Sequence, residues 1–299
     1  MIPFELARPR SLNEAIALLD PEDPDIRPVG GGTAVMLMMK AGVLRPTRLV
    51  SLRDIEPHYA QVRAGANGEL RIGGLTRLAT LEHSPLVKEG WPLLSRTLRT
   101  LSNVRVRNVA TIGGNLGHAD PHMDMPPVLT SLGARVTITG PNGERTVPVE
   151  ELCTGYYETL LARDELISEV IVPPQAGRPA AYMKVTTRAA HDWPALGVAV
   201  VLDMKGPKTI GHASVIVGAA TDRPTRLTQA ETLLRGASPD DFAILREAGE
   251  AGAAQLDIVG DPHGSASYKK QLLKVYLGRA VRTALAAAEG RAAPFEGHA

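Results

Sequence analysis

Apolar residues recur at helical spacing near the start of the chain. The stripe runs from Leu12 to Leu19. Ser11 with Glu14 three residues later makes a capping box, and Pro21 stops the pattern. We therefore expect an amphipathic helix in this segment.

Extended and helical patterns alternate through the next part of the chain. Residues 26–29 predict a strand, a run of glycines follows, and 33–40 predicts the start of a helix. A second strand is expected at 48–52, followed by a connection over 54–66. A new unit then begins near residues 69–73.

Later elements are predicted from the same two periodicities. Thr76 is expected to cap a short helix that ends near Leu81. Pro141-Asn142-Gly143 signals a hairpin between two strands. The other predicted elements are helices at 91–101, 125–133, 226–234, 239–255 and 268–288, and strands at 134–139, 144–149, 181–187, 196–204 and 210–219. Beyond a proline- and glycine-containing boundary at 170–179, strands come first and helices last, which predicts an α+β layer pair.

Composition narrows the possible functions. The 299 residues carry 33 Lys and Arg against 32 Asp and Glu, and the net charge of +1 argues against a nucleic-acid-binding protein. The single Cys153 excludes an intrachain disulfide and a self-contained cysteine-ligated iron–sulfur cluster, so we expect a buried structural thiol. No export signal is visible, and no apolar run approaches the roughly 20 residues of a membrane span, so a cytoplasmic protein is expected.

Three consecutive glycines between a predicted strand and a predicted helix form the first candidate site. Its residues are Gly30, Gly31, Gly32, Thr33 and Ala34. Such a turn lets backbone amides approach an anion at a helix N-terminus, and a diphosphate is the natural ligand. Neither the dinucleotide fingerprint G-x-G-x-x-G nor a P-loop is present. A tight strand-to-helix turn without a ligand is the alternative.

A second glycine-rich segment forms the second candidate site. Its residues are Thr111, Gly113, Gly114, Asn115 and, further on, Asp124. We expect the two glycines to expose their amides, and Thr111 and Asn115 to offer polar side chains to a phosphate or a ribityl chain. Asp124 is placed either to accept hydrogen bonds from ligand hydroxyls or to cap the next helix. Two anion-binding turns favour one long ligand with a diphosphate, such as FAD.

The same stretch allows a metal site as an alternative. The residues of ligand type are His118, Asp120, His122 and Asp124. Pro121 interrupts them, and no recognised metal-binding spacing is present. Arg105 and Arg107, just before the glycines, are as well placed for solvent or a partner subunit as for a phosphate.

A third candidate lies between two predicted strands of the C-terminal part. Arg188 and Asp192 are expected to pair across a turn. Alternatively, this loop covers the edge of a flavin, with Trp193 or His191 near the ring.

Several motifs occur in one order along nearly the whole chain. They are Phe4 to Ile16, the glycine run with Met38-Met39-Lys40, Ile72 to Thr76, Val109 to Asn115, Ala119-Asp120-Pro121, Asp124-Met125-Pro126, Lys184, Arg188 to Asp192, Tyr268-Lys269 and Arg279-Ala280. Together they resemble the FAD-binding medium subunit of molybdenum hydroxylases, the family of the carbon monoxide dehydrogenase medium subunit and of the FAD domain of xanthine dehydrogenase.

The resemblance implies an α+β fold. A two-subdomain FAD-binding domain of the PCMH type is expected over 1–175, with subdomains of about 1–57 and 58–175. A smaller α+β domain of antiparallel sheet plus helices is expected over 176–289, and a flexible tail over 290–299.

The resemblance also implies roles for the candidate residues. Both glycine segments hold the FAD diphosphate, Asp124 contacts the cofactor, and Lys184 lies in a strand beside the flavin, with Trp193 as a further candidate. Many relatives have His-Ser or Thr-Asp where this chain has Thr33-Ala34, which leaves backbone amides as the main contact there.

The function implied is that of an oxidoreductase subunit, which takes electrons from [2Fe-2S] clusters and passes them to an external acceptor. Because this chain has one cysteine, the clusters are expected on a small partner subunit and the molybdopterin on a large one, in a dimer of heterotrimers. This chain then needs no catalytic acid, base or nucleophile and no metal. A stand-alone flavin-dependent oxidase or reductase, and a non-redox assembly protein, are the alternatives.

Overall fold

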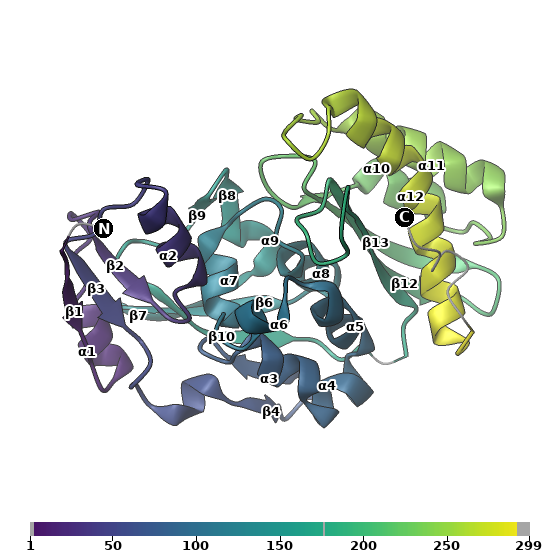
Figure 1. Ribbon diagram of the computed structural model, residues 1–299. Helices are drawn as coiled ribbons and strands as arrows, with labels where there is room; N and C mark the ends of the chain where they lie inside the picture. Colours follow the sequence, from purple (N-terminus) through teal and green to yellow (C-terminus); the bar gives the residue numbers. More distant parts are fainter. Residues whose placement is uncertain (1–2, 176, 292–299) are drawn as a thin grey trace.

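The computed structural model describes residues 3–175 and 177–291, which form three main sheets with helices beside each of them (Figure 1). The first sheet is parallel and small. Its strands, in spatial order, are β1 (Glu5–Ala7), β3 (Arg48–Ser51) and β2 (Ile26–Val29). Helix α1 (Leu12–Ala17) begins at Ser11, whose side chain accepts the Glu14 amide as the capping box predicts. Helix α2 (Thr33–Lys40) follows the glycine run.

The second sheet is antiparallel and has five strands. In spatial order these are β4 (Val62–Ala64), β5 (Leu70–Gly73), β10 (Leu166–Val172), β6 (Arg135–Gly140) and β7 (Gly143–Pro148). Its helices are η1 (Pro57–Ala60), α3 (Leu78–His83), α4 (Pro85–Gly90), α5 (Pro92–Thr100), α6 (Val104–Arg107), α7 (Ile112–His118), α8 (Met125–Ser131) and α9 (Val149–Leu152), followed by a hairpin of β8 (Cys153–Gly155) and β9 (Glu158–Thr159). The predicted hairpin at Pro141-Asn142-Gly143 is confirmed.

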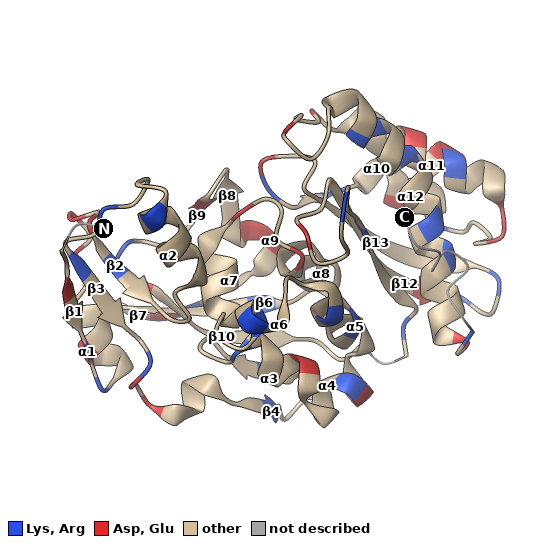
Figure 2. Ribbon diagram, viewed as in Figure 1, with Lys and Arg blue, Asp and Glu red and all other residues tan. Residues whose placement is uncertain are grey.

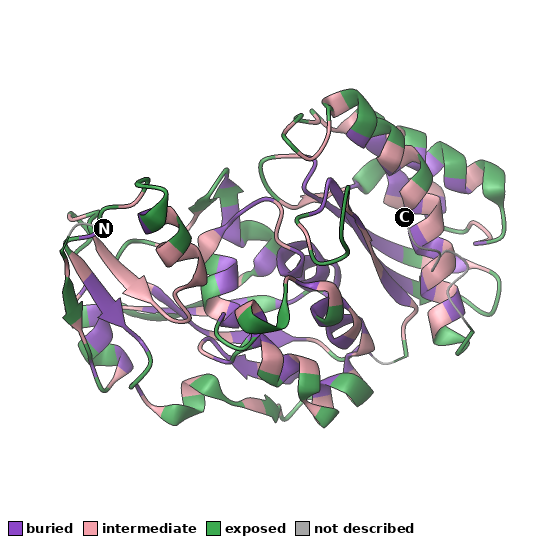
Figure 3. Cartoon of the chain, viewed as in Figure 1, coloured by how far each residue is buried: buried purple, intermediate pink, exposed green. Residues whose placement is uncertain are grey.

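The third sheet lies between two layers of helices. Its strands are β11 (Ala180–Val185), β12 (Leu196–Met204), β13 (Ile210–Gly218) and β14 (Thr225–Arg226), and its helices are α10 (Thr228–Leu234), α11 (Phe242–Gln255) and α12 (Ala266–Ala288). Strand β12 is buried on both faces, because Val198 and Val200 join the core of the C-terminal helices while Ala199 and Val201 join the core around α8 (Figure 3). The N-terminal half (residues 3–175) and the C-terminal half (residues 177–291) are therefore joined through an apolar sheet face.

Several predicted boundaries differ from the structure. Thr76 does not cap a helix: its hydroxyl donates to the carbonyl of Gln61, and α3 begins after Arg77. The connection over 54–66 contains a helical turn and strand β4. Helices α4 and α6 were not predicted, because each is short and lacks an apolar repeat. Of the predicted tail, residues 292–299 lie outside the described residues.

Charged residues of both signs are interspersed along the ribbon (Figure 2), in keeping with the net charge of +1. Among the described residues, no helix is long and apolar enough to cross a membrane. The predicted burial of Cys153 is confirmed, and this burial raises the pKa of its thiol to about 11.

Helix α8 is buried along its whole length and packs against β12 and β13, so its core side chains support both halves of the chain. We expect Leu129→Ala, at a fully buried position, to lower the free energy of unfolding by about 2–5 kcal/mol through lost burial and the cavity left behind. The matched control Leu37→Ala, at a side chain 61% exposed, is expected to change it by about 0.5 kcal/mol or less. Urea unfolding followed by circular dichroism measures both, and equal effects would contradict this assignment of the core.

Candidate cofactor-binding site

The two glycine segments lie in direct backbone contact. A Cβ atom on Gly31 would lie 2.7 Å from Ala110 Cα and would overlap the carbonyl oxygen of Val109. A Cβ atom on Gly30 would lie 2.8 Å from Thr111 Oγ1. Only residues without side chains allow this approach. The predicted convergence of the two segments is therefore present in the structure.

The first turn presents a helix N-terminus without a side-chain cap. Gly32 is the N-cap of α2 and adopts a left-handed conformation with φ +82°. Because Gly32 has no side chain, the amides of the first turn of α2 receive no cap from it. Such amides, with the partial positive charge of the helix end, suit a phosphate oxygen.

In the second turn both glycine amides have hydrogen-bond partners within the chain, whereas they were expected to be exposed. The Gly113 amide donates to the carbonyl of Gly74 at 2.8 Å, and the Gly114 amide donates to Thr111 Oγ1 at 3.2 Å as the cap of α7. A Cβ atom on Gly113 would lie 2.7 Å from the Gly74 oxygen. Gly113 is thus required for close packing against the strand end at Gly74, and its amide has a partner within the chain.

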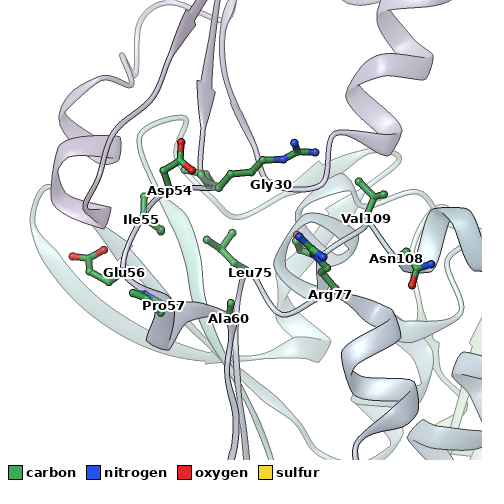
Figure 4. Close-up of a pocket in the computed structure, with 13 residues that line it drawn as sticks. Gly30, Asp54, Ile55, Glu56, Pro57, Ala60, Leu75, Arg77, Asn108 and Val109 are labelled. Atoms are coloured by element: carbon green, nitrogen blue, oxygen red, sulfur yellow. The ribbon is translucent and has the colours of Figure 1, made fainter.

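A cavity of about 580 Å³ opens beside the contact between the turns. Gly30 and Thr111 line it, and Figure 4 shows Leu75 and Arg77 between the segment 54–60 on one side and Asn108 and Val109 on the other. Neither Leu75 nor Arg77 was predicted from the sequence to line the site. The signal available was the neighbouring Gly73-Gly74 pair, which precedes both residues.

Asn115 carries a buried polar atom without a partner. Its Nδ2 donates to the Met123 sulfur at 3.0 Å, whereas its buried Oδ1 has no hydrogen-bond partner among the described residues. A buried acceptor left unpaired costs about 1–3 kcal/mol, so such atoms point to a missing donor. Together with the glycine contact and the open helix end, this fits a ligand that carries both hydroxyls and a diphosphate.

Asp124 pairs across the two halves of the chain and does not cap α8, although it is the residue that precedes this helix. One carboxylate oxygen accepts from Lys184 Nζ and the other from the Tyr182 hydroxyl, both at 2.8 Å. Lys184 Nζ also donates to the carbonyl of Thr100 at 3.0 Å. Burial raises the pKa of the Asp124 carboxyl, while Lys184 and Tyr182 oppose that shift. The structure brings together Asp124 and Lys184, two residues predicted to contact the cofactor.

The loop before β12 has the predicted ion pair. Arg188 and Asp192 lie 3.3 Å apart at an exposed position. The side chain of Trp193 is 53% exposed, and its ring centroid lies 6.1 Å from that of His263. Arg107 is neither solvated nor turned toward a ligand, because it is buried with Glu82.

The metal alternative is not supported. Among residues 3–175 and 177–291, no group of three or more His, Cys, Asp or Glu side chains is placed to hold a metal ion. Asp120 and His122 contact each other, but His118 packs against Tyr157 and Asp124 pairs with Lys184.

Two known families account for nearly all of the chain. Residues 2–175 match the family described as the FAD binding domain in molybdopterin dehydrogenase, and residues 181–284 match the CO dehydrogenase flavoprotein C-terminal domain. The chain belongs to the family of FAD-binding medium subunits of molybdenum hydroxylases. The predicted α+β fold, the FAD cofactor and the oxidoreductase class are thereby confirmed.

Individual relatives cover nearly the full length. The glyceraldehyde dehydrogenase medium chain of Sulfolobus acidocaldarius is 31% identical over 93% of this chain and 97% of its own length. The carbon monoxide dehydrogenase medium chain of Hydrogenophaga pseudoflava is 33% identical over 98% of this chain and 100% of its own. A solved chain of carbon monoxide dehydrogenase from the same organism superposes with a TM-score of 0.90 at 33% identity, over 96% of this chain and 99% of that one.

The buried pair of this medium subunit can be tested directly. We expect Lys184→Met to lower the free energy of unfolding by about 3–5 kcal/mol, because the Asp124 carboxylate is then buried without its cation. The control Lys88→Met, at an exposed position of α4, is expected to change it by about 0.5 kcal/mol or less. The double variant Lys184→Met with Asp124→Leu is expected to recover most of the loss in denaturant unfolding. A Lys184 variant as stable as the control would show that the pair is not formed in solution.

Proposed function

We propose that this medium subunit holds FAD at the contact between its two glycine turns and passes electrons from an iron–sulfur partner subunit to an external acceptor. The observation that carries the proposal is the unpartnered Oδ1 of Asn115, one turn into the helix that begins at the second glycine segment. A hydroxyl of the ribityl chain is the kind of donor that this atom lacks.

The other candidate residues support the same ligand. The amides that follow Gly32 in α2 would receive the diphosphate, and Thr111 with the backbone of Gly30 would line its binding site. The cavity beside them has room for a further part of the ligand. We propose that Asp124 and Lys184, already oriented by each other, position the flavin end, with Trp193 on its exposed side.

When bound, FAD supplies the redox chemistry, since a flavin can exchange electrons one at a time or in a pair. The chain's part is to bind, to orient and to exclude water. It supplies no cysteine cluster, because Cys153 is its only cysteine. Electrons must therefore arrive from another chain if they come from a cluster.

Partner subunits follow from the same reasoning. The relatives are named medium chains of dehydrogenases. We propose a small [2Fe-2S] subunit and a large molybdopterin subunit as partners, in a dimer of heterotrimers. We also propose domain boundaries near residues 57, 175 and 289, because the three main sheets use residues 5–51, 62–172 and 180–226 and the last helix, α12, ends at Ala288.

The proposed role of Asn115 predicts opposite effects on stability and on binding. Asn115→Leu removes an unpaired buried acceptor, so the free energy of unfolding of the cofactor-free chain is expected to stay unchanged or to rise by about 1 kcal/mol. The same variant is expected to weaken FAD binding about tenfold, because a ligand hydroxyl loses its acceptor. Fluorescence titration with FAD and urea unfolding measure the two effects.

The control for this experiment is Asn13→Leu, at an exposed position of α1, which is expected to leave FAD affinity unchanged. Unchanged affinity in the Asn115 variant would remove the main support for the site.

The proposed partners can be sought by co-expression. We expect a tag on this chain to co-purify a cysteine-rich small chain and a large molybdopterin chain encoded beside it, with one FAD for each medium subunit. A purified chain that carries FAD and turns over a reduced substrate without partners would instead support a stand-alone oxidase or reductase. A stable complex that contains no FAD would support the assembly protein.

A further inference from the structure

A row of hydrogen-bonded polar side chains connects the two halves of the molecule. None of its members is assigned above to the cofactor. The Tyr157 hydroxyl donates to Asp120 Oδ2 at 3.0 Å. His122 Nδ1 lies 3.1 Å from Asp120 Oδ1, and His122 Nε2 lies 2.8 Å from Asp261 Oδ2. Asp261 in turn pairs with Lys269, whose Nζ also donates to a backbone carbonyl.

His122 is the member that bridges the halves. It lies in the segment between α7 and α8, whereas Asp261 lies in the loop that leads to α12 and Lys269 lies in α12 itself. The side chains of His122 and Lys269 are only 12% and 1% exposed. At such burial, water replaces a lost hydrogen bond poorly, so the protonation state of His122 matters to the contact.

The geometry favours a His122 ring that carries a hydrogen on both nitrogens. Each nitrogen faces a carboxylate oxygen, and an ionised carboxylate can only accept. The imidazolium donates to both carboxylates. A neutral ring donates to one and turns a lone pair toward the other, so that one of the two hydrogen bonds becomes a repulsion.

Acidic and basic side chains alternate along this row of hydrogen-bonded groups. Asp120 and Asp261 flank it directly, Lys269 lies behind Asp261, and the Tyr157 hydroxyl lies behind Asp120. The ring of His263 packs 5.1 Å from that of His122.

The pKa values follow this order of charges. Burial opposes protonation of His122, but its hydrogen bonds to the two carboxylates outweigh burial and raise its pKa. Burial acts against ionisation of Asp261, but Lys269 and His122 lower its pKa to about 2.

Backbone strain is concentrated at the same place. Ala119, Tyr157 and Ala219 adopt positive φ angles of 50°, 58° and 62°, and only one other non-glycine residue does so among the residues that the structure describes. The Tyr157 amide donates to the Ala119 carbonyl, and the Ala219 amide donates to the carbonyl of Pro121. Such conformations cost about 1–3 kcal/mol each and persist where surrounding contacts enforce them, often at functional sites.

The C-terminal end of the strained segment 119–124 contacts the proposed FAD site through two neighbouring residues. Met123 accepts the hydrogen bond from Asn115 Nδ2, and Asp124 follows directly with its contact to Lys184. Because Met123 and Asp124 directly follow His122, a shift of His122 relative to the C-terminal half disturbs the contacts of Asn115 and Lys184.

We infer that His122 is a positioning residue which, in its doubly protonated form, latches the segment 119–124 to the C-terminal half and thereby holds Asn115 and Asp124 in place for FAD. This inference rests on the proposed function for its effect on FAD, whereas the latch itself does not. The packing of α8 against the apolar face of the third sheet does not titrate. It joins the two halves at any protonation state of His122, and the latch only adjusts how they meet.

The direction of the pH dependence follows from the raised pKa of His122. The stabilisation is fully present below the unfolded pKa, at about 6.5, and is lost as the pH rises through the higher folded value. FAD affinity is therefore expected to fall about five- to tenfold between pH 6 and pH 8.5 in the wild-type chain, a coupling of ordinary size.

The test compares the wild type with His122→Gln and a matched control, His83→Gln, whose exposed ring lies within hydrogen-bond distance of the Ala79 carbonyl in its own helix. FAD dissociation constants are measured by fluorescence titration at pH 6, 7 and 8.5, and melting temperatures of the cofactor-free chains at the same pH values. We expect His122→Gln to bind FAD weakly at pH 6 and to show no further loss at pH 8.5. The control should follow the wild type in both measurements.

Each outcome separates the latch from the proposed function. A wild-type affinity that does not fall with pH, or an equal fall in His122→Gln, would overturn the latch. If no chain binds FAD, the proposed function fails. The latch is then judged by melting temperature alone, where the wild type must lose more stability than His122→Gln between pH 6 and pH 8.5. Parallel melting curves would overturn it without reference to FAD.

Discussion

The close approach of two backbone segments at Gly31 determines the rest of the site. The small parallel sheet and the larger antiparallel sheet have separate cores, and a side chain at Gly31 would separate the turns that extend from them. Because backbone touches backbone, Gly30 of the first turn and Thr111 at the beginning of α7 line one cavity. The two turns that we propose hold FAD come from different parts of the fold and not from one βαβ unit, so this mode of binding needs no Rossmann fingerprint.

The attachment of the C-terminal half follows a different rule. Alternate residues of β12 belong to different cores, so this strand contributes to both halves at once. Apolar burial of this kind is strong but not directional. The buried pair of Asp124 and Lys184 adds direction, because its hydrogen bonds fix one alignment of α8 against β11. Buried pairs add little net stability and are better understood as specifying geometry.

The sequence predicted most of the elements and pointed to the segments that we propose hold FAD. Helical and alternating patterns gave the long helices and the paired strands, and glycine runs located both turns. Hydrogen-bond partners could not be predicted, because they are distant in sequence: the Gly113 amide bonds to Gly74, and Asp124 bonds to Lys184, which is 60 residues away. Asp before Met-Pro-Pro is equally typical of a helix cap. Only the tertiary fold distinguishes a capping aspartate from one that pairs with a distant lysine.

The same limit explains why the metal alternative could be stated from the sequence but not decided there. His118, Asp120 and His122 alternate along five residues that include a left-handed residue, Ala119, and the structure does not bring the three side chains together as a metal site. Asp120 and His122 meet each other, and the remaining partner of His122 comes from a residue 139 positions away. The two carboxylates beside His122 carry two negative charges. Lys269 and the protonated imidazole balance them. This group therefore offers a divalent cation less than an unpaired acidic cluster would, and favours a proton as the species that it binds and releases.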